Sequence, residues 1–139
     1  MPKSITLTTT YPHSIEKVWK ALTDPQAMSE WLMPCNIEPR VGHQFQFQTK
    51  PYPGFDGTVH CEVLEVVPPE KLSFSWSGGS LTNTIVSFHL QAVEEHTQLT
   101  FEHQGFEGLF NALVVRRLLA NGWKKKILTI QLPNYLAHE

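Results

Sequence analysis

Histidine and aromatic residues are the side chains of this sequence that could do chemistry or hold a ligand. The chain has seven His, eight Phe, four Trp and three Tyr among 139 residues. An imidazole titrates near neutrality and serves as an acid or base, while clustered aromatic rings line apolar pockets. Only His43 and His103 are predicted to share a face with the rings. His103 is therefore the candidate polar anchor of an apolar site, with a satisfied core histidine as the alternative.

The predicted site is a pocket of several hundred Å³ between a curved sheet and a helix, although a fully packed core is the other interpretation of the same residues. Phe101 shares the inward face with them, and Trp31 could either pack or border the mouth. The candidate ligand-binding residues are Trp31, Phe45, Phe47, Phe74, Trp76, Phe88, His103, Trp123 and Ile127.

Other chemistries lack their sequence patterns. No His-x3-His, Cys-x2-Cys or His-Glu-x2-His spacing is present, so we expect no metal site, and no phosphate or dinucleotide loop predicts a cofactor. Cys61 lies in a predicted strand whose neighbours His60 and Glu62 point to the opposite face, away from its sulfur. We expect Cys35 and Cys61 to be free structural thiols, and we assign no catalytic residue.

Composition narrows the class of protein. The formal charge of −2 and the pI of about 6.4 argue against a nucleic-acid partner, since the one basic run is Lys124 to Lys126. No apolar stretch reaches the roughly 18 residues of a membrane span, and the N-terminus lacks the apolar core of a signal peptide. We expect a cytoplasmic protein with no membrane partner, folded as one domain over residues 1–139.

The first third of the sequence predicts a strand followed by two short helices. Residues 4–10 alternate with a period of two, as in a half-buried strand. Ser14 is a good N-cap for a helix whose apolar stripe is Ile15, Val18, Trp19 and Leu22. Asp24 and Pro25 repeat the start signal, and a second helix carrying Met28, Trp31 and Leu32 is expected to stop before Pro34.

The middle of the sequence predicts about five antiparallel strands with tight turns. Four of these strands alternate between one apolar and one polar face. For residues 58–67 the inward set stays open, because apolar side chains occupy both faces. The predicted inward residues elsewhere are Val41, His43, Phe45 and Phe47; Leu72, Phe74 and Trp76; Thr84, Val86, Phe88 and Leu90; and Leu99, Phe101 and His103.

The last third changes to helical spacing. We expect a break near Asn121 and Gly122 and a kink or stop around Pro133. Strands with a single apolar face need a cover, and this helix is the one long element that remains. The predicted fold is therefore α+β, a curved antiparallel sheet wrapped around a long C-terminal helix. The apolar stripe expected along the helix is Leu109, Phe110, Leu113, Val114, Leu118, Trp123, Ile127 and Ile130.

Motifs along nearly the whole chain carry a family resemblance. The sequence resembles the Hsp90 ATPase activator homologue (AHSA1-like) family of the START/Bet v 1-like, or SRPBCC, superfamily. The matching segments are His13 to Pro25 (HSIEKVWKALTDP), Trp31, Val41 to Phe45 (VGHQF), Cys61 to Leu72 (CEVLEVVPPEKL), Phe74 to Trp76 (FSW), Leu99 and Thr100, His103 to Phe106 (HQGF), and Gly122 and Trp123. The sequence departs from the family pattern at Pro133 and between Phe106 and Gly122.

The resemblance implies a helix-grip fold with a cavity that often holds an apolar or aromatic molecule. We therefore expect a monomer or homodimer that binds a small hydrophobic ligand, with an aromatic one favoured, and no committed catalysis. One alternative is a cyclase or aromatase-like enzyme that uses His103 as acid or base on a polyketide-like ring. Another is a protein-interaction module for a chaperone or a stress response, with its cavity filled.

Overall fold

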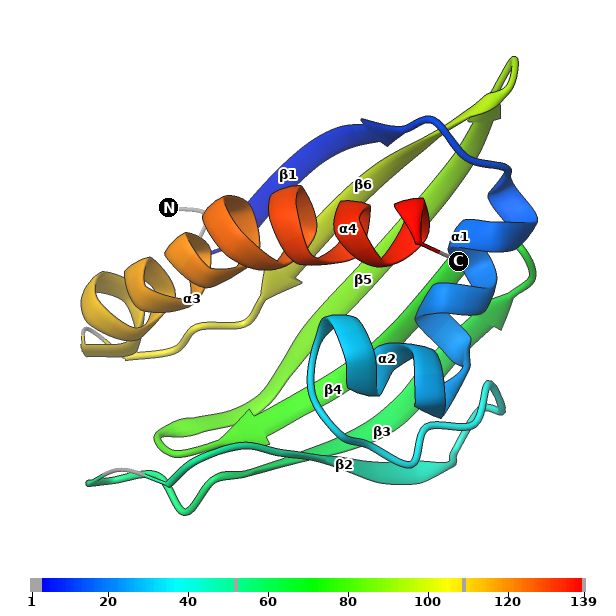
Figure 1. The fold of residues 1–139 in the computed structure, drawn as a ribbon. Helices are drawn as coiled ribbons and strands as arrows, with labels where there is room; N and C mark the ends of the chain where they lie inside the picture. Colours follow the sequence, from blue (N-terminus) through cyan, green and yellow to red (C-terminus); the bar gives the residue numbers. More distant parts are fainter. Residues whose placement is uncertain (1–3, 52, 109, 139) are drawn as a thin grey trace.

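The computed structural model, which describes residues 4–51, 53–108 and 110–138, has a six-stranded antiparallel sheet curved around a long C-terminal helix (Figure 1). The strand order across the sheet is β1-β6-β5-β4-β3-β2. The predicted α+β helix-grip architecture is confirmed. The strands are β1 (Ser4–Tyr11), β2 (Gln44–Gln48), β3 (Thr58–Val67), β4 (Lys71–Gly78), β5 (Leu81–Val93) and β6 (His96–Gln104).

Two short helices, α1 (Ile15–Thr23) and α2 (Pro25–Trp31), follow β1 as expected. The Ser14 hydroxyl accepts a hydrogen bond from the Lys17 backbone N–H at 3.2 Å, which caps α1. Pro25 occupies the first turn of α2, where its missing N–H has no helical partner to lose. Both helices bury one face toward the concave side of the sheet.

The register of β3, which the sequence left open, changes partway along the strand. Val59, Cys61 and Val63 are buried, and a register shift against β4 follows between Val63 and Glu65. Leu64, at the shift, and Val67, after it, are 41% and 44% exposed, whereas Val66 packs against the core. A bulge of this kind reverses the inward and outward positions, which explains why apolar residues occupy both faces.

The predicted inward position of Val41 is wrong. The strand β2 begins only at Gln44, and Val41 is 62% exposed in the turn before it. Gly42 has a φ of +89°, a left-handed conformation that ends the period-two alternation. His43 lies beside the end of the strand, where its ring stacks on Phe45 at 6.2 Å.

The C-terminal helix contains two stretches of π-helix. It runs through η1 (Asn111–Val115), α3 (Arg116–Gly122), η2 (Trp123–Gln131) and α4 (Leu132–Ala137). The expected break at Asn121 and Gly122 is wrong, because the chain stays helical there and only its hydrogen-bonding pattern changes.

Pro133 does not stop the helix either, and the reason lies in the π-helical turn before it. The Leu132 backbone N–H donates to the carbonyl of Ile127, five residues earlier. The next carbonyl, that of Leu128, would need the N–H that Pro133 lacks. Instead, the Tyr11 hydroxyl on β1 donates to the Leu128 carbonyl oxygen at 2.7 Å.

The buried face of the C-terminal helix differs from the predicted stripe. Four predicted stripe residues in its first half, and Ile130 in its second, are exposed, while Leu109 lies outside the described residues. The π-helical turns change the angular spacing of side chains, so a stripe drawn at 3.6 residues per turn loses its phase. The buried residues of this helix are Ala112, Trp123, Leu128, Leu132 and Leu136.

Candidate ligand-binding site

His103 lies at the centre of a buried hydrogen-bond chain that joins the sheet to the C-terminal helix. The Trp123 indole N–H donates to Nδ1 of His103 at 3.3 Å, and Nε2 of His103 lies 2.8 Å from the Thr84 hydroxyl oxygen. The Thr84 hydroxyl in turn donates to the carbonyl oxygen of Trp76 at 2.7 Å. His103 and Thr84 have no exposed surface.

These partners fix the protonation of the imidazole. Because Trp123 can only donate, Nδ1 of His103 must be the acceptor, and the proton therefore lies on Nε2 and points at Thr84. Burial lowers the pKa of His103 from 6.5 to about 3. At neutral pH the ring is uncharged, and each polar side-chain atom in this hydrogen-bond chain has a partner.

Aromatic rings surround His103 on several sides. Trp76 and Trp123 contact each other at 5.6 Å between ring centroids, and His103 contacts Trp76 at 5.5 Å and Phe106 at 4.8 Å. Phe101 packs on Trp123 at 4.5 Å. The described side chains thus form a closed shell around one imidazole, with Trp123 as its contribution from the helix.

The other predicted aromatic residues continue this shell toward β2. Phe47 contacts Trp76 at 5.6 Å and Phe74 at 6.0 Å, while Phe45 contacts Phe74 at 5.2 Å. Phe88 lies between Phe74 and Trp123, at 6.1 and 6.5 Å. The structure thus brings together with His103 six residues of the predicted set, Phe45, Phe47, Phe74, Trp76, Phe88 and Trp123.

Trp31 and Ile127 lie apart from the rings around His103. The Trp31 indole N–H donates to the Ala21 carbonyl oxygen at 2.8 Å, which joins α2 to α1, and only 1% of the residue is exposed. Ile127 is half-buried beside the core. Trp31 thus packs in the core and does not border an opening.

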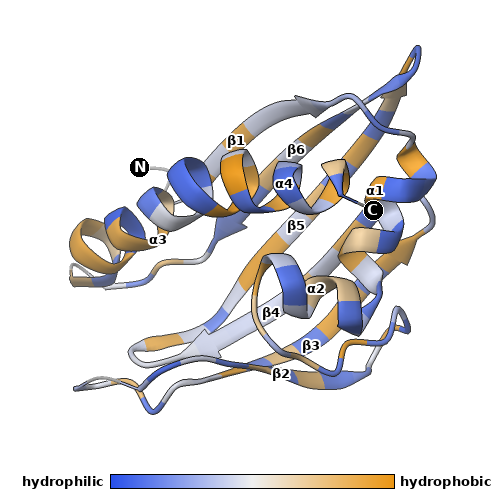
Figure 2. Ribbon diagram, in the orientation of Figure 1, coloured by the Kyte–Doolittle hydropathy of each residue, from blue (hydrophilic) through white to orange (hydrophobic). Residues whose placement is uncertain are grey.

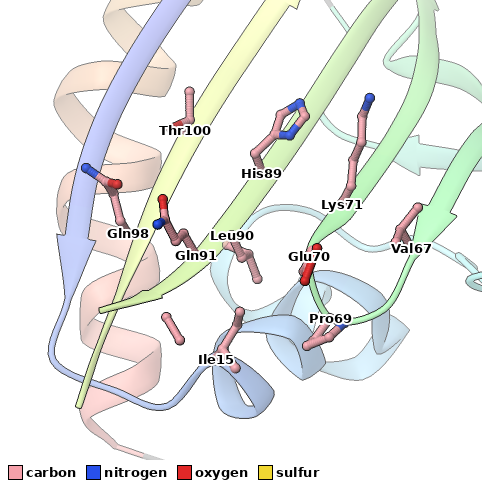
Figure 3. A pocket seen from close by; sticks show the side chains of 11 residues that line it. Ile15, Val67, Pro69, Glu70, Lys71, His89, Leu90, Gln91, Gln98 and Thr100 are labelled. Atoms are coloured by element: carbon pink, nitrogen blue, oxygen red, sulfur yellow. The ribbon is translucent and has the colours of Figure 1, made fainter. Parts of the chain in front are cut away.

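Two hollows are open and lie at the protein surface. One of about 750 Å³ lies between the start of α1, the turn after β3, and strands β5 and β6 (Figure 3). Lys71, His89 and Thr100 project into it, and Lys71 is paired with Glu65 at 2.8 Å. A second, of about 530 Å³, is mainly polar and includes Phe45 in its lining. Neither hollow reaches His103.

The two thiols are poor nucleophiles. Both cysteines are free, and burial raises the pKa of Cys61 and of Cys35 above the ordinary value. Within residues 4–51, 53–108 and 110–138, no group of three or more His, Cys, Asp or Glu side chains could hold a metal ion. No helix in the same ranges is long and apolar enough to cross a membrane.

Sequence reasoning missed two of the residues around His103. Thr84 was expected to face inward, but its hydroxyl was not recognised as the partner of the imidazole. A hydroxyl at an inward position of an otherwise apolar strand is the signal that could have found it. Phe106 lies beyond the end of β6 after Gly105, which has a φ of +96°, so no periodic pattern reaches it.

Comparison with known proteins identifies the family. The pattern of the family described as "Activator of Hsp90 ATPase homolog 1-like protein" matches residues 12–136. The chain belongs to this family. The match includes β2 to β6, both short helices and nearly all of the C-terminal helix. No curated protein sequence matches this chain.

Solved structures share the fold over almost the entire chain. Protein MLL2253 from Mesorhizobium loti has a TM-score of 0.85 and 28% identity, and the match covers 97% of each chain. DynU16, from the dynemicin biosynthetic locus, has a TM-score of 0.79 and 24% identity over 99% of this chain and 48% of its own. The Aha1 dimer from Colwellia psychrerythraea has a TM-score of 0.76 and 20% identity over 92% of each chain.

Proposed function

We propose that this protein, as a single domain of residues 1–139, binds a small hydrophobic molecule between the curved sheet and the C-terminal helix. An aromatic ligand fits best, because the candidate residues are mainly aromatic rings that stack face to edge or offset. The proposed lining residues are Phe45, Phe47, Phe74, Trp76, Phe88, His103 and Trp123, with Ile127 at the margin, whereas Trp31 packs between α1 and α2 outside this set.

The observation that carries the proposal is a single, neutral imidazole inside an aromatic shell. A ligand site needs apolar surface for affinity and a few fixed polar groups for orientation. The Trp123 indole N–H and the Thr84 hydroxyl hold His103 in one tautomer. A ligand hydroxyl that replaced Trp123 as donor to Nδ1 would inherit a preset acceptor.

Ligand entry requires the helix to move, since the rings touch one another in the closed form. The first half of the C-terminal helix, residues 110–122, is the weakly anchored part, because Ala112 is its one buried residue among those described. Displacing this half would open the part of the helix that directly precedes Trp123, the first residue of η2. Segments with few buried apolar contacts open at lower free energy than packed ones.

A fluorescence titration tests the proposal. Trp19→Phe and Trp31→Phe together leave Trp76 and Trp123 as reporters. We expect 2-naphthol to quench them in a saturable, one-to-one manner. His103→Gln should weaken the binding of 2-naphthol more than the binding of naphthalene. The matched variant His89→Gln, on the outer face of β5, should change neither affinity. Quenching without saturation, or equal effects of the two glutamine variants, would reject the site.

The cyclase or aromatase-like alternative is favoured by one observation, the similarity to DynU16 from a biosynthetic locus. It requires His103 to exchange a proton, but the pKa of about 3 keeps the closed form neutral at pH 7. The test is turnover of a linear polyketide-like substrate by purified protein. Activity that disappears in His103→Gln, with the circular dichroism spectrum unchanged, would favour the enzyme.

The chaperone-related alternative is favoured by the family itself, whose description names an activator of the Hsp90 ATPase. In that case the aromatic residues around His103 would simply form the protein core, and the outer surface would contact Hsp90. Stimulation of Hsp90 ATPase turnover that is the same for the parent chain and for His103→Gln would support this alternative over ligand binding.

A further inference from the structure

The first half of the C-terminal helix presents an apolar surface to solvent. Phe110, Leu113, Val114 and Leu118 are 62%, 54%, 43% and 64% exposed. Figure 2 shows these apolar turns at the end of the helix that projects beyond β1. Four such side chains present on the order of 400 Å² of apolar surface, as large as the biggest patch on a typical monomer. Patches of this size are often functional.

The spacing of this patch suits a second helix. Phe110, Val114 and Leu118 follow one another at intervals of four residues, and Leu113 lies beside them. Rows of side chains four residues apart form the ridges that fit between the ridges of a facing helix. The patch is therefore complementary to a copy of itself, as a two-fold contact requires.

The charges along the helix favour an antiparallel over a parallel pairing of two copies. Five of the eleven Lys and Arg residues, and none of the thirteen Asp and Glu residues, lie between residues 110 and 138. Lys124 is ten residues beyond Val114, or about 15 Å along a helix. In an antiparallel pair crossing at Val114, the two lysine runs would lie about 30 Å apart, well beyond the Debye length of about 8 Å, while Arg116 and Arg117 of the two copies would be offset by about 6 to 9 Å along the axis. A parallel pair would bring them together.

The same antiparallel arrangement places opposite charges near each other. Glu107 is exposed just before the helix, seven residues before Val114. It lies at the end of the patch that an antiparallel partner would face with its residues after Leu118, and the first charged residue there is Lys124. Each copy would thus bring its acidic residue to the basic part of the other helix.

We propose that a second copy of this chain docks on the patch Phe110, Leu113, Val114 and Leu118, as an antiparallel two-fold helix pair centred on Val114. The four side chains of both copies alone supply roughly 800 Å², and their neighbours bring the contact toward the roughly 1,200 Å² of a small specific interface. The resulting dimer is weak and depends on concentration.

Sedimentation velocity over a dilution series tests the dimer. We expect the parent chain to associate in the micromolar range and Leu118→Glu to raise the dissociation constant at least tenfold. Ile130→Glu is the matched control, because Ile130 is 53% exposed on the same helix but lies outside the patch. A parent chain that stays monomeric at 500 µM, or equal effects of both variants, would overturn the proposal.

A cross-linking experiment tests the crossing point separately from the energetics. Under mild oxidation, Val114→Cys should form a disulfide-linked dimer, whereas Ile130→Cys and the parent chain, whose own thiols are buried or half-buried, should not. Preferential cross-linking of Ile130→Cys would overturn the geometry. Binding of a monomer to phosphatidylglycerol vesicles, lost in Leu118→Glu, would assign the patch to a lipid surface instead.

Discussion

The two halves of the C-terminal helix are both rich in apolar residues, yet they have opposite environments. The second half buries Trp123, Leu128, Leu132 and Leu136 against the sheet, α1 and α2. The first half, from Phe110 to Gly122, buries only Ala112 among its described residues. Apolar content therefore does not decide which part of a helix joins the core. The neighbouring elements decide it, because the helix begins beyond the sheet (Figure 1) and α3 lies beside the edge strand β1.

The second half of the helix is therefore an anchor, and the first half is weakly held. The anchor holds Trp123 against Phe101 and His103, and the Tyr11 hydroxyl ties its backbone to β1. Because the first half has few buried apolar contacts, we expect its amide protons to exchange with solvent faster than those of the anchor.

Replacing Trp123 by alanine should lower the free energy of unfolding by about 3 to 5 kcal/mol. The indole ring contacts Trp76, Phe88 and Phe101, and its removal leaves a cavity and an imidazole without its donor. Urea denaturation followed by circular dichroism measures the change. A loss below 1 kcal/mol would show that the second half of the helix is not an anchor.

Acid should destabilise the protein through His103. Its folded pKa of about 3 lies below the unfolded value of 6.5, so the unfolded chain binds a proton that the folded chain refuses. This contribution to stability is complete above pH 6.5 and is lost as pH falls toward 3, with a slope approaching about 1.4 kcal/mol per pH unit. Urea midpoints between pH 7 and pH 4 should fall more steeply for the parent chain than for His103→Gln. Parallel curves would contradict the neutral, buried imidazole.

Tyr11→Phe should lower the free energy of unfolding by about 1 to 3 kcal/mol, since it leaves the buried Leu128 carbonyl without a donor. The control is Thr129→Ala, which removes an exposed hydroxyl bonded to the Lys124 carbonyl on the same helix and should change stability by less than about 0.5 kcal/mol. Thermal unfolding measures both. Equal changes in melting temperature for the two variants would show that the Tyr11 hydroxyl is not needed to stabilise the helix at Pro133.

The smallest effect is expected for Leu118→Ala, measured at concentrations too low for association. Because Leu118 is 64% exposed, its truncation should change the free energy of unfolding of the monomer by less than about 0.5 kcal/mol. A loss comparable with that of Trp123→Ala would mean that the first half of the helix is also part of the core, and the comparison would fail.

The sequence predicted the sheet well because period-two alternation is a direct consequence of strand geometry. Phe74, Trp76, Phe88 and Phe101 are all buried on the predicted face. The exception is Val41, where a left-handed glycine interrupts the alternation, and the strand whose inward set stayed open, β3, is the one with a register shift. Such irregularities depend on tertiary pairing and leave little trace in a local pattern.

The helix was predicted less well for a physical reason. Its π-helical turns and the hydroxyl of Tyr11, distant in sequence, let the chain continue through Gly122 and Pro133. Local rules treat both residues as interruptions because they count only backbone partners within the helix. For the candidate site, the sequence placed His103 on one face with the rings that contact it, while the Thr84 hydroxyl emerged as its partner only once strands β5 and β6 were paired.

Nuclear magnetic resonance of the four tryptophan indole N–H groups tests ligand binding beside His103 most directly. During a titration with 2-naphthol, the signals of Trp123 and Trp76 should shift to saturation. The signal of Trp31, held by the Ala21 carbonyl away from the rings around His103, should stay in place. Equal shifts of Trp31 and Trp123, or shifts that grow linearly without saturation, would contradict a ligand site between the sheet and the helix.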